Sequence, residues 1–244
     1  MPDLLSSIAG WYGKTPSLGD FASRRLPQGF LSAWDAWLQH GMAASRAQLG
    51  ASWLDIYLNS PIWRFTLLPG LCGPQAWVGL MMPSIDKVGR HFPLTLALPI
   101  EPRRDLLADI VAAQSWYAAL ERIALATLNM DFSVDDLERE LGEHPLLLAE
   151  PHQSVDDSSM EQLADWWQSP AQYPRLLHLS SLNALPEALA GAAQKLLANL
   201  GYGKSLWWMS VEPDDPAQLC CFAGLPPESH FAALLQGLAV LEEH

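Results

Sequence analysis

The stretch IWRFTLLPGLCGPQAWVGLMMPSIDKVGRHFPLTLAL, residues 62–98, decides the fold because it holds three short apolar runs in succession. The runs IWRFTLL, AWVGLMM and FPLTLAL are partly aromatic or β-branched and too short for typical helices, which favours strands. The glycine- and proline-rich segments PGLCGP and PSIDKVGRHFP separate them and are typical of turns. Neighbouring strands with connections of this length predict an antiparallel meander.

Helical spacing of apolar residues is found on both sides of these strands. It predicts helices over 30–42, 52–58, 105–128 and 133–144. The last of these begins with a variant of the capping box, in which Ser133 stands three residues before Asp136. Residues 143–159 are polar and acidic and contain two prolines, which indicates a long surface loop or hinge.

The second half of the chain again mixes strands with helices. It predicts strands in RLLHLSS, SLWWMSV and QLCCFAG, and helices over 186–200 and 227–243. The sequence therefore predicts an α/β (α+β) fold, with a largely antiparallel mixed sheet and helices packed on its faces. Residues 1–244 are expected to form a single domain, and any internal boundary is expected near residues 143–159.

Composition limits the classes of partner. The chain has 14 lysines and arginines against 27 aspartates and glutamates, a net charge of −13 that disfavours binding to nucleic acid or anionic lipid. Three cysteines, two of them adjacent, fit a reducing compartment better than a disulfide framework. The apolar runs are shorter than a membrane span, and Asp3 stands where a signal peptide has a basic residue. We therefore expect a cytoplasmic protein without a membrane span or export signal.

Two stretches resemble a phosphate-binding loop. The loop motif requires a glycine five residues before the Gly-Lys pair, so that backbone N–H groups can surround the phosphates. Ile8 occupies that position in SIAGWYGKTPSLGDF, where Pro16 also removes an N–H, and Ala198 occupies it ahead of Lys204. We therefore predict no nucleotide binding at either stretch.

Candidate catalytic and metal-ligating residues are scattered along the chain. Ser84 follows a proline at a strand end, where a turn-forming role is the simpler interpretation. Cys72 has no neighbour in sequence that would lower its pKa. The acidic and histidine residues between His144 and Asp157 lack HExxH or EF-hand spacing, which favours a solvated loop. We accordingly predict no catalytic residue, cofactor or metal site.

Polar residues in the front half are more informative, because glycine-bounded loops display fixed side chains. The candidate partner-binding residues are Lys14, Asp20, Arg24, Asp86 and Arg90. A structural role is equally compatible with them: Asp20 or Asp86 can pair with Arg90 and tie two loops together. In either case we expect a carboxylate within salt-bridge reach of Arg90.

Two pairs of adjacent tryptophans are further candidates for a protein-binding surface. In each pair, Trp207 with Trp208 and Trp166 with Trp167, the two indoles should lie on opposite faces if the element is extended, or about 100° apart if it is helical. One member of each pair can be exposed at a protein interface, although core packing is the alternative for most of the tryptophans.

Several spaced blocks resemble the TagF/ImpM family of type VI secretion-associated proteins. They are GWYGKTPSLGDF, LPQGFLSAWDAWLQHGM, LGASWLDIYLNSPIWRF and WVGLMMPSIDKVGRHFPLT, in collinear order up to Pro99. The most specific patterns are Gly-Lys-x-Pro-x-x-Gly-Asp-Phe and Pro-Ser-x-Asp-x-x-Gly-Arg-x-Phe-Pro-Leu. After Pro99 only SLWWM and FAGLP are similar to the family.

The resemblance implies a cytoplasmic accessory protein that restrains type VI secretion after translation. It implies action with a forkhead-associated (Fha-type) scaffold protein, in opposition to a threonine-phosphorylation branch. Some members of the family carry a fused phosphatase domain, whose acidic metal-binding motifs are absent from this sequence. A non-enzymatic regulator that binds a scaffold is thus the leading hypothesis. A small-molecule or nucleotide sensor with a pocket near the two loops, and a hydrolase with non-contiguous residues, remain as alternatives.

Overall fold

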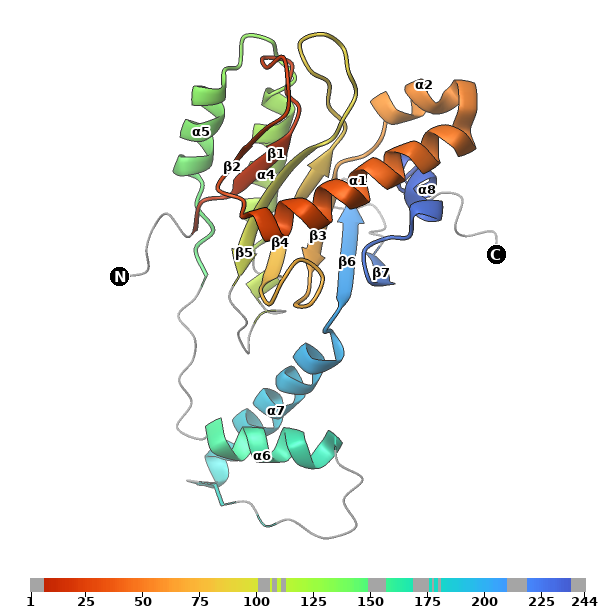
Figure 1. Ribbon diagram of the computed structural model, residues 1–244. Helices are drawn as coiled ribbons and strands as arrows, with labels where there is room; N and C mark the ends of the chain where they lie inside the picture. The colour runs from red at the N-terminus through yellow and green to blue at the C-terminus, as the bar shows by residue number, and fades with distance from the viewer. Residues whose placement is uncertain are drawn as a thin grey trace, which may run out of the picture.

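The computed structural model describes residues 7–100, 106, 109–110, 113–148, 157–168, 176, 178–179, 181–209 and 219–237. At its centre is a seven-stranded sheet in the order β2-β1-β5-β4-β3-β6-β7, and every neighbouring pair of strands is antiparallel (Figure 1). The strands are β1 (Gly10–Gly13), β2 (Ala22–Arg24), β3 (Trp63–Leu67), β4 (Ala76–Met82), β5 (Leu94–Ile100), β6 (Lys204–Met209) and β7 (Leu219–Ala223). The predicted meander is confirmed as β3, β4 and β5.

Helices cover both faces of the sheet (Figure 1). One face carries α1 (Gln28–Leu49), α2 (Trp53–Leu58) and α8 (Phe231–Leu235), and the other carries α4 (Gln114–Ala126) and α5 (Val134–Glu143). Two further helices, α6 (Asp157–Gln168) and α7 (Leu185–Leu200), pack against each other and project from one end of the sheet. The predicted α+β architecture, with helices on the faces of an antiparallel sheet, is confirmed.

The α1 face of the sheet holds an aromatic core. Strand alternation turns Trp63, Phe65 and Leu67 of β3 toward α1, where all three are fully buried. The rings of Trp34 and Phe65 lie 4.8 Å apart, and the Trp34 indole N–H donates to Thr95 Oγ1 at 2.9 Å. Each such side chain contributes roughly 1.5–3 kcal/mol through burial, and the hydrogen bond removes the cost of a buried polar group.

The α4 face is mostly aliphatic but contains the buried charge of Arg64. Arg64 of β3 points into this face, where its Nε donates to Glu121 Oε1 at 2.7 Å and its Nη1 donates to Gln114 Oε1 at 2.9 Å. On the neighbouring helix α5, Ser133 and Asp136 form the predicted capping box, with the side chain of each accepting from the backbone of the other. The Arg64 contacts hold α4 against β3, and the capping box stabilises the first turn of α5.

Several sequence-based assignments differ from the structure. The short strands β1 and β2 and the helix α6 were not predicted; β1 is Gly-rich and β2 is only three residues long. The strand predicted in RLLHLSS is wrong for its described residues, which have no strand structure. In the C-terminal prediction, the helix begins at Phe231 after a short 3-10 turn, and residues 238–244 lie outside the described residues.

The expected hinge near residues 143–159 is only partly described, since residues 149–156 lie outside the described ranges. No described helix combines the length and the apolarity that crossing a bilayer requires.

Candidate functional site

The first of two adjoining loops, residues 14–21, begins where β1 ends at Gly13. Gly13 has φ 132°, and a Cβ atom at this position would lie 2.1 Å from the carbonyl oxygen of Pro93. Only glycine therefore allows β1 to approach the chain before β5 so closely. The next residue, Lys14, turns its side chain into the protein, where it is 4% exposed. A buried Lys14 is not available to a phosphate, in agreement with the rejection of the phosphate-loop motif.

The second loop, residues 83–93, joins β4 to β5 and is organised by Asp86. Asp86 Oδ1 accepts hydrogen bonds from the backbone N–H groups of Val88 at 3.0 Å and Arg90 at 2.8 Å. Gly89, with φ 81°, supplies the left-handed conformation that closes this turn. The loop is therefore shaped around the Asp86 carboxylate.

Charged side chains join the two loops. Asp86 Oδ2 accepts from Lys14 Nζ at 2.9 Å and from Arg90 Nε at 2.6 Å. Arg90 Nη2 in turn donates to the Gly19 carbonyl at 2.6 Å and lies 3.7 Å from Asp20 Oδ1. We call Lys14, Asp20, Asp86 and Arg90 the loop junction. The prediction of a carboxylate near Arg90 is confirmed: both candidates, Asp20 and Asp86, lie within salt-bridge distance of its guanidinium group.

The junction holds Asp86 in its charged form. Burial alone would raise the pKa of the Asp86 carboxyl. The hydrogen bonds from the Lys14 ammonium, from the backbone and side chain of Arg90 and from the Val88 N–H outweigh burial and hold this pKa well below its ordinary value. Asp86 is thus a permanent acceptor at neutral pH, which suits a structural anchor.

The junction is buried on one side and exposed on the other. Lys14 and Asp86 are almost fully buried, whereas the side chains of Arg90 and Asp20 are 54% and 80% exposed. Of the four, Asp20 and Arg90 are therefore the residues that a partner can touch directly. Lys14 and Asp86 hold Arg90 in place through the Asp86 carboxylate.

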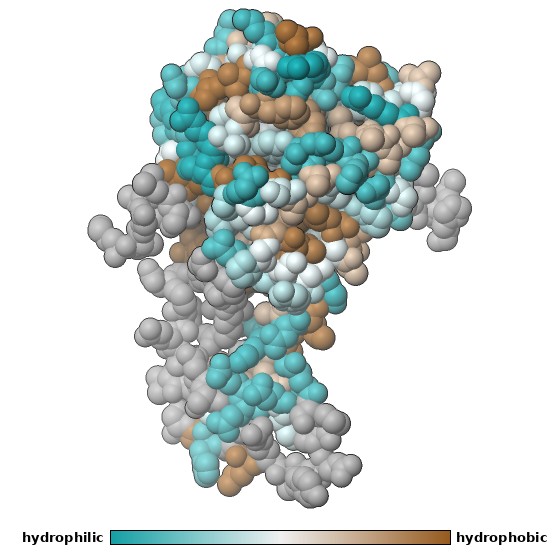
Figure 2. Space-filling model, viewed as in Figure 1, coloured by the Kyte–Doolittle hydropathy of each residue, from teal (hydrophilic) through white to brown (hydrophobic). Residues whose placement is uncertain are grey.

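Two exposed apolar side chains flank this charged pair. Phe21 is 45% exposed, and its ring packs edge-on against Phe92, with the Lys14 ammonium 4.7 Å from its centre. Val88 at the tip of the second loop is 69% exposed. We call Asp20, Phe21, Val88 and Arg90 the junction rim. The two loops lie at the top of the view in Figure 1, and Figure 2 shows hydrophobic and hydrophilic residues next to each other at this end of the molecule.

Arg24 does not join the junction. It was predicted in a loop, but it lies on strand β2 opposite Trp11 and is exposed. The next residue, Arg25, has φ 59°, and its guanidinium donates to the Ala9 carbonyl and pairs with Glu138 of α5. Trp11 Nε1 donates to Glu138 Oε1 at 2.6 Å. This clamp across the β1–β2 edge was not predicted, because Trp11 and Glu138 are 127 residues apart.

The two candidate nucleophiles lack an activating base among the described residues. The hydroxyl oxygen of Ser84 is buried without a hydrogen-bond partner, while its backbone N–H and carbonyl both bond the Tyr57 hydroxyl. Cys72 is buried, and burial raises the pKa of its thiol to about 12. Neither hydrogen-bonds a described histidine, so neither has the geometry that a nucleophile requires. No three described His, Cys, Asp or Glu side chains form a group suited to a metal ion.

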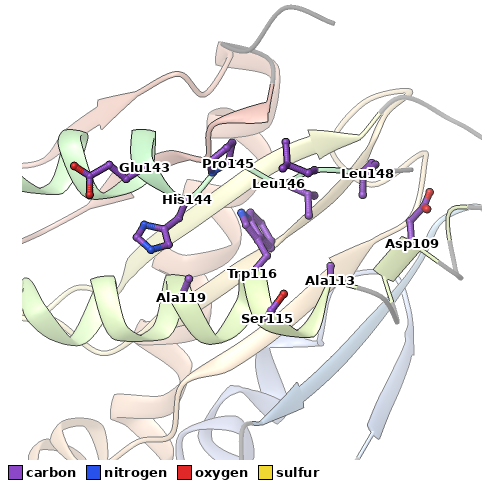
Figure 3. A pocket seen from close by; sticks show the side chains of 11 residues that line it. Asp109, Ala113, Ser115, Trp116, Ala119, Glu143, His144, Pro145, Leu146 and Leu148 are labelled. Atoms are coloured by element: carbon purple, nitrogen blue, oxygen red, sulfur yellow. The ribbon is translucent and has the colours of Figure 1, made fainter. Parts of the chain in front are cut away.

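A pocket lies on the α4 side of the molecule (Figure 3). Its volume is about 430 Å³, and its walls are one face of α4, including Trp116, and the chain that follows α5, including His144 and Leu146. No member of the loop junction lines it. It is therefore not the pocket near the two loops that the sensor hypothesis calls for.

Comparison with known proteins places this fold and both loop motifs in one class, the type VI secretion system-associated domains. Residues 10–144 match the TagF N-terminal domain, which is described in those terms. The crystal structure of PA0076 from Pseudomonas aeruginosa PAO1 is similar over 94% of each chain, with 35% sequence identity and a TM-score of 0.69. No match is found among curated proteins. The chain belongs to the TagF family.

Proposed function

We propose that this chain is a non-enzymatic, post-translational repressor of type VI secretion that acts in the cytoplasm by binding a forkhead-associated scaffold protein. Membership of the TagF family supports the pathway. The observation that supports binding is the junction rim, in which an exposed ion pair, Asp20 with Arg90, is flanked by exposed Phe21 and Val88.

The rim has the features of a recognition surface. Arg90 is oriented by two fixed acceptors, the buried Asp86 carboxylate and the Gly19 carbonyl, so that less side-chain freedom is left to lose when a partner binds. Aromatic and arginine side chains are enriched at the centres of protein interfaces. In this proposal Asp20 and Arg90 contact the scaffold, while Lys14 and Asp86 position Arg90. Arg24 stands outside the junction, and the proposed contact does not depend on it.

A mechanism by occupancy fits the chemistry of the described residues better than catalysis does. The Cys72 thiol is held protonated by burial, and the Ser84 hydroxyl has no base beside it among the described residues. The net charge of −13 disfavours direct action on DNA. Binding to a protein is the mode of action that these features support.

Deleting and overproducing the protein tests the proposal. Deletion should raise type VI secretion without changing transcript levels, and overproduction should silence secretion even when the kinase branch is active. Repression should titrate with dose, as mass action requires of a stoichiometric binder. A catalyst would instead act at amounts far below those of its target. If the deletion strain secretes no more than its parent, the proposal is wrong.

A further inference from the structure

The junction rim lies at the end of the sheet where β1 ends and β5 begins (Figure 1). Residues 7–100 are described without a gap, so both loops and the strands that carry them are fully defined. Lys87 of the second loop donates its backbone N–H to the Leu18 carbonyl at 2.9 Å. Arg90 Nη2 donates to the next carbonyl of the first loop, that of Gly19. Two basic residues of the second loop are therefore held along one stretch of the first.

Exposed positive charge outnumbers exposed negative charge in the two loops and β2. Asp86 is neutralised inside the junction by Lys14, and Arg25 is paired with Glu138 of α5. The charged residues left over are all exposed, and they are three cations and one anion, Arg24, Lys87, Arg90 and Asp20. This part of the surface thus carries a local surplus of positive charge in a chain whose net charge is −13. We call the three cations the basic end.

We propose that the basic end binds an acidic patch on a folded protein and that charge steers the two surfaces together. This inference rests on the proposed function, since the forkhead-associated scaffold is the protein that would carry the patch. Arg90 uses Nε and Nη2 for contacts within the junction, and its Nη1 is the nitrogen that can meet a carboxylate of the partner. Lys87 supplies a second exposed cation on the same loop.

A folded protein fits this surface better than a nucleic acid or a membrane does. Duplex DNA and an anionic bilayer extend far beyond a patch of three cations, so they would also face the acidic remainder of the chain and be repelled. The exposed side chains of Phe21 and Val88 belong to the same two loops and favour a partner that presents apolar side chains as well. An acidic patch of limited extent, with apolar residues next to it, has the matching chemistry.

Arg24 contributes at a distance. It lies on β2 opposite Trp11, outside the junction, and so adds to the electric field without touching a partner seated on the rim. Charges outside a contact act mainly on the rate of association, whereas contacting charges also act on the rate of dissociation. Replacing Arg24 by glutamine should therefore slow association about two- to threefold and leave dissociation almost unchanged.

Binding kinetics of the purified scaffold at two salt concentrations test the proposal. Raising NaCl from about 0.05 M to about 0.5 M shortens the Debye length about threefold and should weaken the wild-type complex about tenfold or more, mainly through slower association. Lys87→Glu should weaken the complex about fivefold or more at the lower salt concentration, and Lys87→Gln by a smaller factor. Lys204→Glu is the matched control, because it makes the same charge change at an exposed lysine on the opposite end of the sheet. It should bind like the wild type.

The outcomes separate this inference from the proposed function. A complex that salt does not weaken, or that Lys87→Glu and Lys204→Glu affect equally, overturns the inference and leaves repression by scaffold binding in place. No complex of the wild type at either salt concentration overturns both. Duplex DNA and phosphatidylglycerol vesicles are the competing probes, and wild-type binding to either that is lost in Lys87→Glu would overturn an acidic protein as the partner.

Discussion

Lys14 Nζ lies 2.9 Å from Asp86 Oδ2, and this buried ion pair joins residues that are 72 positions apart in the chain. Lys14 belongs to the motif GKTPSLGDF and Asp86 to the motif PSIDKVGRHFPL. The two most specific motifs of the sequence are therefore halves of one structure. Together they fix the Arg90 side chain at the surface through the Asp86 carboxylate.

Replacing Lys14 by methionine should destabilise the fold. Loss of one partner from a buried ion pair costs about 3 kcal/mol, which corresponds to a fall in Tm of about 6–12 °C in a chain of this length. Lys87→Met, at an exposed position in the second loop, is the matched control and should leave Tm almost unchanged. Equal melting temperatures for the two variants in a thermal scan would contradict the structural role of Lys14.

Acid should weaken the fold through Asp86. Its pKa in the folded chain is held below the ordinary value of about 3.9, so the unfolded chain binds a proton first as pH falls. The contribution of the charged carboxylate to stability is complete above about pH 5 and is lost progressively below about pH 4. In denaturant unfolding, Asp86→Asn should be less stable than the wild type at pH 7, and this difference should narrow below pH 4. Parallel stability curves down to pH 3 would exclude a lowered pKa at Asp86.

Cys72 should behave as an inert core residue. Burial raises the pKa of its thiol to about 12, so at pH 8 almost none is present as the reactive thiolate. A thiol reagent in dilute solution should label the exposed Cys221 rapidly and Cys72 only after unfolding. Cys72→Ala should leave the rapid phase unchanged, whereas Cys221→Ser should remove it. A rapid phase that disappears in Cys72→Ala would revive the hydrolase hypothesis.

Sequence patterns predicted the core of the sheet well. Strand β4 has the same bounds as the predicted strand, because AWVGLMM is apolar throughout and bounded by turn residues. Strand β6 and helix α7 were also located, from aromatic content and from helical spacing after a proline. Such elements bury whole faces, and burial leaves a strong local pattern.

Some elements were missed because they depend on contacts between residues far apart in the chain, and such contacts leave no local pattern in the sequence. The β1–β2 edge is stabilised by Trp11 and Arg25, both bonded to Glu138, and no local pattern indicates such a contact. The positive φ of Arg25 also runs against the usual preference for glycine. Helix α6 buries only a few small or flexible side chains, such as Met160 and Ala164, against α7. Its apolar residues Met160, Leu163, Ala164 and Trp167 nevertheless follow helical spacing, so a local pattern for this helix was present in the sequence.

The candidate site was predicted in part. The carboxylate partner of Arg90 followed from charge and loop position, and the structure confirms it. The burial of Lys14 did not follow, because a lysine after a glycine-rich turn is normally solvated. The difference between positioning residues and exposed residues at the junction depends on burial, which only the three-dimensional arrangement of both loops defines.

Binding of the purified forkhead-associated scaffold protein to this chain tests the central claim most directly. Titration calorimetry should detect a stoichiometric complex with the wild type. Arg90→Glu, which reverses a charge on the junction rim, should weaken this complex at least tenfold. Arg122→Glu, an exposed charge on α4, is the matched control and should bind like the wild type. Failure of the wild type to bind, or equal affinity for wild type and Arg90→Glu, would contradict repression through the junction rim.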